Sequence, residues 1–176
     1  MTRAQHDTQF AEWMGEHSSI AVRTARAFEF EIEGQADLLQ EILVTWWRSI
    51  PNFPKSGNPR QWLYRVSLNA TLTWQRRELR RRRVIDRGAP FAQLVESFAQ
   101  PADSVDREAI DDLYRAIQRL RPAERALILL HLDGFSYEEI AATFGISANA
   151  VGSRLSRTRD NLARLLKGIP HHHERV

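Results

Sequence analysis

The stretch that decides the fold spans residues 136–157 and reads SYEEIAATFGISANAVGSRLSR. It opens with a capping box, in which the Ser136 hydroxyl caps an amide of the first helical turn and Glu139 reaches back. The short helix that follows ends at Gly145, a residue suited to a tight left-handed turn. Ser147 then caps a second, longer helix. A short helix, a glycine turn and a capped longer helix predict a helix-turn-helix, whose second helix reads DNA.

The second helix should run to about Lys167, and at about 100° per residue its residues separate into two faces. The apolar face carries Ala148, Val151, Leu155, Thr158 and Leu162. The opposite face presents amide, hydroxyl and guanidinium groups, which can contact base edges and phosphates in a major groove. The alternative is a helical hairpin whose arginines are simply solvated. The candidate DNA-reading residues on this face and its flank are Asn149, Gly152, Ser153, Arg154, Ser156 and Arg157.

The rest of the chain is also predicted to be helical, because apolar residues recur at helical spacing and no useful alternating stretch appears. Residues 50–59 interrupt this pattern with three prolines and a glycine and are predicted to form a loop. We therefore expect an all-α fold of two small helical domains joined by a flexible linker, in which one short helix is possible over residues 91–98. The expected boundaries are 1–83 and 105–170 for the domains, 84–104 for the linker and 171–176 for a tail.

Composition excludes several classes of protein. The 176 residues include no cysteine, which excludes a disulfide scaffold, a cysteine-based zinc site and a cysteine nucleophile. No apolar run approaches the roughly 18 residues that a membrane span requires, so we expect a cytoplasmic protein without membrane insertion. No carboxylate or histidine cluster has metal-ligand spacing, and neither a glycine-rich phosphate loop nor a nucleophile elbow is present. These features argue against a small nuclease or hydrolase, and no cofactor, metal or catalytic residue is expected.

Charge is segregated along the chain, although the formal net charge is only +3. Residues 1–41 carry three basic and eight acidic side chains, whereas residues 48–87 carry eleven basic and two acidic ones. The alternation repeats, with five basic and nine acidic residues over 103–139 and five basic and one acidic over 147–167. Two separated basic blocks indicate nucleic acid as a partner, because each must face a polyanion or repel itself.

The second half of the chain resembles region 4 of the bacterial extracytoplasmic-function (ECF) sigma factors. The resemblance rests on Leu120-Arg-Pro-Ala-Glu-Arg125, the run from Leu130 to Ala141, Gly145-Ile-Ser147 and the run from Val151 to Arg159. It implies that residues 147–159 read a −35 promoter element. Gly152 departs from the family, which usually has a basic residue there. Three interpretations stay open for Gly152: a lost phosphate contact, a position that contacts nothing, and a close approach of the backbone to DNA.

The first half resembles sigma region 2. Asp37-Leu-Leu-Gln-Glu41 followed by Trp47 is similar to region 2.2, the surface that binds the clamp helices of RNA polymerase. Phe53, the run from Arg60 to Arg65 and Asn69 are similar to regions 2.3 and 2.4, which melt and read the −10 element. The resemblance implies an alternative sigma factor whose partners are core RNA polymerase (clamp and flap), promoter DNA and an anti-sigma factor. The polymerase-binding candidates are Asp37, Gln40, Glu41 and Trp47.

The chemistry of residues 50–83 fits this assignment independently. A base flipped from duplex DNA needs a pre-shaped pocket of stacking surface and hydrogen-bonding groups, because unstacking costs about a few kcal/mol. The short polar loop, with Asn58 at its end, can supply such a pocket, and the arginines after it can hold the flanking phosphates. The −10 candidates are Asn52, Phe53, Lys55, Ser56, Arg60, Asn69, Trp74, Arg76, Arg77 and Arg80.

Several alternatives remain at this stage. Trp46, Trp47 and Trp62 are favoured as core residues over base-stacking platforms, while Trp74 is open between the two roles. The run Arg80–Arg83 is either a phosphate contact or a solvated helix end. The competing function is a stand-alone helix-turn-helix regulator that binds DNA without polymerase and uses its first half for dimerisation.

Overall fold

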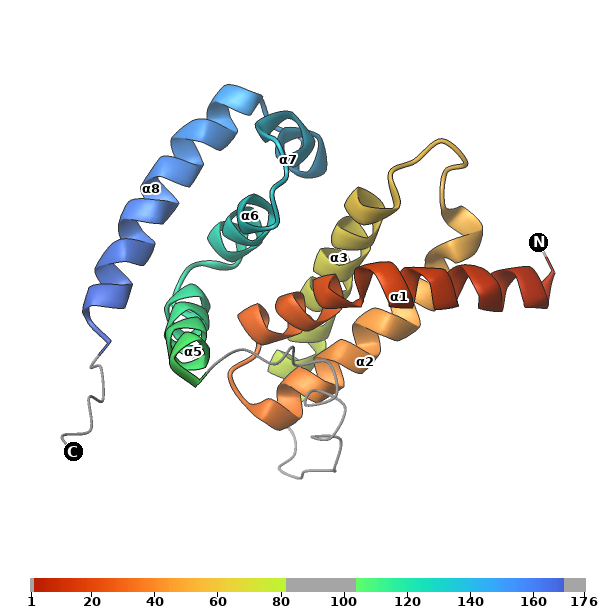
Figure 1. The fold of residues 1–176 in the computed structure, drawn as a ribbon, viewed down its shortest axis with the longest axis horizontal. Coiled ribbons are helices and arrows are strands. Elements are labelled where there is room, and N and C mark those ends of the chain that lie inside the picture. Colours follow the sequence, from red (N-terminus) through yellow and green to blue (C-terminus); the bar gives the residue numbers. More distant parts are fainter. Residues whose placement is uncertain (1, 82–103, 170–176) are drawn as a thin grey trace. The chain divides into compact units, whose positions relative to one another are not determined.

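The structure is a computed structural model that describes residues 2–81 and 104–169. The described residues form helices and no strand, which confirms the all-α prediction. The helices divide into two compact units, α1 to α3 in the first and α5 to α8 in the second (Figure 1). The predicted linker, apart from Ser104, the possible helix over 91–98 and the predicted tail lie outside the described residues.

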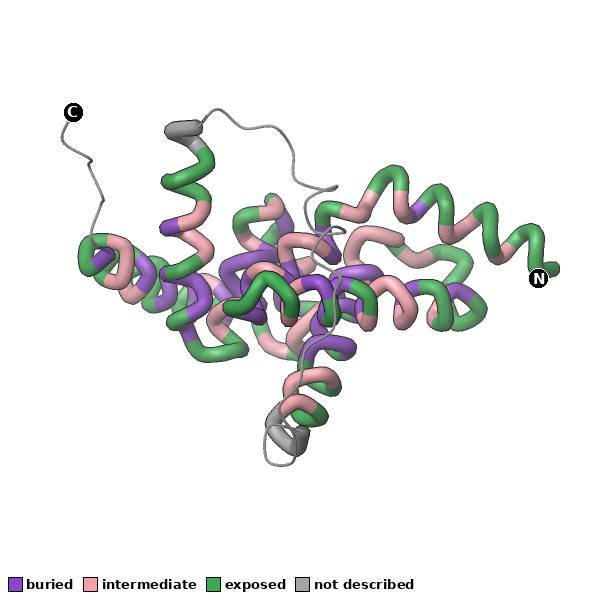
Figure 2. The backbone as a smooth tube through the Cα atoms, turned by 90° about the horizontal axis from the view of Figure 1, so that it is seen from below, coloured by how far each residue is buried: buried purple, intermediate pink, exposed green. Residues whose placement is uncertain are grey.

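The first unit is a bundle in which each long helix packs against the other two. Its elements are α1 (Arg3–Phe28), α2 (Ile32–Ser49), the short 3₁₀ helix η1 (Ile50–Asn52) and α3 (Pro59–Arg81). Fully buried aliphatic and aromatic side chains fill the centre; among them are Ile20, Leu38, Leu39, Ile42, Trp46, Leu63 and Tyr64. In Figure 2 the buried positions gather where these helices face one another, and the first turns of α1 are largely exposed.

A buried hydrogen-bond chain fixes α2 against α3. The Trp46 indole N–H donates to the Ser67 hydroxyl at 2.9 Å, and that hydroxyl donates to the Leu63 carbonyl at 2.7 Å. The Trp46 indole and the Ser67 hydroxyl therefore both have partners, which removes the penalty for burying these two groups unpaired. Trp46 is a core residue, as predicted, and it sets the spacing of the two helices that carry the candidate site residues of this unit.

The second unit consists of α5 (Ser104–Gln118), α6 (Pro122–Leu132), α7 (Tyr137–Phe144) and α8 (Ala148–Lys167). The predicted apolar stripe of α8 is buried at Val151, Leu155, Thr158 and Leu162. This stripe packs against α5, α6 and α7, so α8 is held along most of its length by the rest of the unit.

The predicted caps of the helix-turn-helix are confirmed. The Ser136 hydroxyl accepts from the Glu139 N–H at 3.2 Å, and the Glu139 carboxylate accepts from the Ser136 N–H at 2.8 Å. Gly145 has φ of 65°, a left-handed conformation that glycine adopts without the steric cost of a Cβ. The Ser147 hydroxyl then accepts from the Ala150 N–H at 3.2 Å and starts α8.

A second reciprocal contact starts α6. The Glu124 carboxylate accepts from the Arg121 N–H at 3.1 Å and pairs with the Arg121 guanidinium at 2.6 Å. The hydrogen bond from this guanidinium lowers the pKa of the Glu124 carboxyl from its usual value. The Leu120-Arg-Pro-Ala-Glu-Arg125 motif therefore has a local structural role, since it begins the helix that supports α8.

Candidate DNA-reading and polymerase-binding surfaces

The outward face of α8 carries the predicted −35-reading residues. The stripe on the other side of the helix is buried, so the reading residues are directed away from the core. Their side chains come from the first three turns, where a recognition helix contacts base edges. The exposed members are Asn149, Ser153, Arg154, Ser156 and Arg157.

Gly152 is half-buried, whereas the other five candidate reading residues are exposed. A Cβ added there would lie 3.4 Å from Cε2 of Tyr137, an ordinary van der Waals distance. Tyr137 is the first residue of α7, and it is 40% exposed. Position 152 therefore has the Tyr137 ring as a neighbour within the protein, and all three interpretations of its relation to DNA stay predictions.

We expect Gly152→Arg to tighten binding of a −35 duplex and to steepen its salt dependence. The added Cβ fits beside Tyr137, arginine is a far better helix former than glycine, and one more phosphate contact raises the slope of log K against log[salt] by about 0.9. Titrations at several salt concentrations measure both quantities. Tighter binding at an unchanged slope would assign the effect to helix propensity alone. Weaker binding would mean that the backbone, or the Tyr137 ring, must approach the DNA closely.

The loop between η1 and α3 is anchored by its aromatic residue. The Phe53 ring meets Trp13 of α1 edge-on at 5.3 Å between centroids and Trp62 of α3 at 5.9 Å. Gly57 closes the turn, since its N–H donates to the Pro54 carbonyl at 2.8 Å. A Cβ at position 57 would lie 3.1 Å from both the Phe53 ring and the Pro54 oxygen, so a side chain there would crowd the loop.

This packing separates the residues of the predicted base pocket into an exposed group and an anchoring group. Asn52, Lys55 and Ser56 are exposed and available to a ligand. Phe53 is half-buried in the aromatic cluster, and Asn58 caps α3, because its side-chain oxygen accepts from the Gln61 N–H at 3.3 Å. The two groups have complementary roles, since the anchoring residues fix the backbone that presents the exposed ones.

Most of the basic side chains of α3 are on its surface. The Arg65 guanidinium lies 4.6 Å from the centroid of the half-buried Trp62 ring, a cation–π geometry. Asn69 and Arg76 are exposed, and Arg60 is half-buried in the first turn. Arg80 belongs to α3, but its side chain lies outside the described residues, as do those of the rest of the Arg80–Arg83 run.

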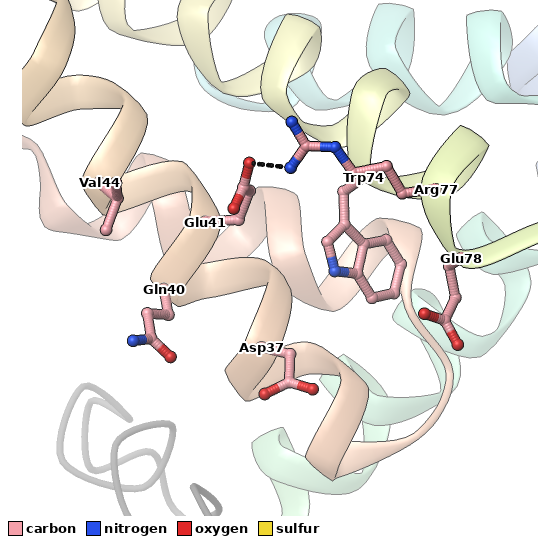
Figure 3. A pocket seen from close by; sticks show the side chains of 7 residues that line it. All are labelled: Asp37, Gln40, Glu41, Val44, Trp74, Arg77 and Glu78. Atoms are coloured by element: carbon pink, nitrogen blue, oxygen red, sulfur yellow. Dashed lines mark hydrogen bonds and ion pairs between the residues drawn. The ribbon is translucent and has the colours of Figure 1, made fainter. Parts of the chain in front are cut away.

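An open pocket of about 460 Å³ lies between α2 and α3. It brings together two sets of residues that the sequence assigned to different partners: Asp37, Gln40 and Glu41 for polymerase, and Trp74 and Arg77 for DNA. Figure 3 shows the Trp74 indole at the centre of the pocket, with carboxylates around it. Arg77 Nη1 donates to Glu41 Oε1 at 2.9 Å across the two helices.

Trp47 lies on the surface of α2, whereas the sequence favoured a place in the core. It is 42% exposed, and the His6 ring of α1 lies against it at 4.4 Å between centroids. The exposed edge of α2 therefore continues from the acidic residues of the pocket towards Trp47, as the region 2.2 resemblance implies. The core expectation for Trp47 is wrong because Trp46 and Trp47 are about 100° apart on the helix and only Trp46 faces the bundle.

Sequence reasoning missed several residues that contact the candidate sites. Neither Trp13 nor Tyr137 is a candidate from the sequence, yet one anchors Phe53 and the other lies beside Gly152. Val44 and Glu78 complete the pocket between α2 and α3. Helical spacing from Asp37 and Trp74 could have pointed to the last two, since each lies within about two turns on the same helix. No local signal identifies Trp13.

Comparison with known families agrees with this arrangement. The family description "Sigma-70 region 2" matches residues 14–83, and "Sigma-70, region 4" matches residues 110–162. The ECF RNA polymerase sigma factor EcfG of Rhodopseudomonas palustris is 34% identical over 151 residues, which cover 83% of this chain and 81% of that one. The sigma factor NccH of Alcaligenes xylosoxydans is 28% identical over 166 residues, covering 90% and 87%. The chain belongs to the ECF RNA polymerase sigma factors.

A solved structure shares both units. The sigma factor RpoE of Bartonella quintana, in complex with the anti-sigma factor NepR, superimposes with a TM-score of 0.67 at 25% identity over 92% of this chain and 99% of that one. The protein is thus an alternative sigma factor, which binds core RNA polymerase and directs initiation at specific promoters. Sigma factors are regulators of transcription. None of the helices within the described ranges is long and apolar enough to span a bilayer.

Proposed function

We propose that this sigma factor divides promoter recognition between its units, with α8 reading the −35 element and the loop at 51–58 and α3 opening and reading the −10 element. The observation that carries the proposal is the outward face of α8. Five of its six candidate reading residues are exposed while the intervening stripe is buried. The exposed loop residues lie directly before the basic helix α3, so a flipped base and its phosphates can be held by neighbouring groups.

The acidic edge of α2, from Asp37 to Trp47, is the proposed polymerase surface. Asp37, Gln40 and Trp47 are exposed, and Glu41 lines the same pocket as Asp37. Carboxylates favour basic partners and steer their approach. On this proposal the chain acts in the cytoplasm, where polymerase is, and contributes binding surfaces and not catalytic groups. An anti-sigma factor is a further proposed partner, supported by the complex in which the similar RpoE is found.

Run-off transcription tests the function as a whole. Sequencing of transcript 5′ ends after overexpression identifies promoters, and purified core polymerase is then supplied with a promoter template with and without the protein. We expect transcripts of one defined start site only when the protein is present, and loss of them when either promoter element is scrambled. A stand-alone regulator would instead bind the DNA without polymerase and leave core polymerase unable to start at that site.

A further inference from the structure

The Glu41–Arg77 ion pair joins the two proposed surfaces of the first unit. Glu41 belongs to the acidic edge of α2, and Arg77 belongs to the basic helix α3. Their side chains meet at 2.9 Å, with the Glu41 side chain 30% exposed and that of Arg77 66% exposed. Both groups are therefore accessible to partners, and neither is locked in the core.

The pocket beside the ion pair explains how a partner could reach Glu41. Asp37 lies one helical turn before Glu41 on α2, and Trp74 lies one turn before Arg77 on α3. These four side chains line one open cavity (Figure 3). A cationic side chain that enters it meets three carboxylates, those of Asp37, Glu41 and Glu78, and the Trp74 ring, and each of these groups attracts a cation. Glu41, the carboxylate that Arg77 contacts, is thus one of those that an incoming basic group can contact.

We propose that this ion pair couples polymerase binding to promoter binding. This inference rests on the proposed function of the two surfaces. In the free protein Arg77 is held towards α2 by Glu41 and is withheld from DNA. A basic side chain of core polymerase that pairs with Glu41 releases the Arg77 guanidinium, which then contacts a phosphate of the −10 region.

Linkage makes the coupling reciprocal. If polymerase and Arg77 compete for Glu41, then DNA that draws Arg77 away strengthens polymerase binding by the same factor as polymerase strengthens DNA binding. An exposed ion pair holds its partner weakly, so the expected factor is about two- to five-fold and not an order of magnitude. It should shrink as salt rises, because salt screens exposed charges.

The first test measures DNA binding by the full-length free protein. The probe is a labelled single strand carrying the non-template −10 sequence, titrated at low salt. Glu41→Gln should tighten binding about two- to five-fold more than Asp37→Asn does. The two variants remove the same charge from the same pocket, so their difference reports the release of Arg77. In an Arg77→Gln background the difference should vanish. Three results would overturn the proposal. They are equal effects of the two substitutions, a difference that persists without Arg77, and no binding by any variant.

The second test measures the reciprocal effect on core polymerase. Arg77→Gln should tighten assembly with core, because Glu41 is freed, whereas Arg76→Gln removes the same charge from an exposed neighbouring position. Equal affinities of the two variants for core would contradict the coupling. Failure of the coupling and failure of the proposed function give different results. The proposed function fails only if the unmodified protein neither assembles with core nor supports run-off transcription. Assembly and transcription without a difference between the paired variants would leave the function in place and reject the coupling alone.

Discussion

Replacement of Asp37 and Glu41 by arginine is expected to abolish assembly with core RNA polymerase while leaving the helical fold intact. Asp37 is exposed and Glu41 is half-buried at the edge of α2, so the double change converts an acidic surface into a basic one. Juxtaposed like charges cost about several kcal/mol at an interface, which is enough to remove measurable assembly. The helix should tolerate both changes, because arginine is a good helix former and neither position lies in the core.

Native gel electrophoresis with purified core polymerase measures this effect, and circular dichroism checks the fold. The matched control is Glu12→Arg with Glu16→Arg on α1, which are exposed and have the same spacing and the same charge change. That control should assemble normally. Unchanged assembly of the α2 variant, or equal loss in the α1 variant, would remove the specific role of the α2 edge.

Arg157→Ala is expected to weaken binding to the −35 element by about 5- to 150-fold, which corresponds to roughly 1–3 kcal/mol for a bidentate base contact. Arg157 is exposed on the outward face of α8, in line with Ser153 and Ser156. Competition between the promoter sequence and a scrambled −35 duplex measures the specific part of the loss. The matched control is Arg164→Ala, an exposed arginine on the same face about 10 Å further along the helix axis. A loss of equal size on both duplexes would make Arg157 a phosphate contact.

The helix-turn-helix could be predicted because its determinants are local. Ser136, Glu139, Gly145 and Ser147 lie within a few residues of the amides and carbonyls that they satisfy, so the sequence pattern corresponds directly to hydrogen bonds in the structure. The buried stripe of α8 follows from helical periodicity in the same way.

The contacts between helices of the first unit could not be predicted in this way. Glu41 and Arg77 are 36 residues apart, and their pairing depends on how α2 and α3 pack. The sequence assigned them to different partners because each has the charge of its own segment. The position of Phe53 between Trp13 and Trp62 likewise depends on three elements of the fold at once. Residue type and spacing identified which groups matter, while tertiary packing decided which of them meet.

The aromatic anchor of the loop gives the protein a built-in optical reporter. Phe53 separates two indoles whose N–H groups are buried without a hydrogen-bond partner among the described residues. Phe53 contacts both rings, and the Arg65 guanidinium also lies over Trp62. If the loop at 51–58 withdraws Phe53 when it takes up a flipped base, water reaches both rings and their emission moves to longer wavelength. Promoter opening could then be followed in time with the unlabelled protein, with Trp13→Phe and Trp62→Phe variants assigning the signal to each ring.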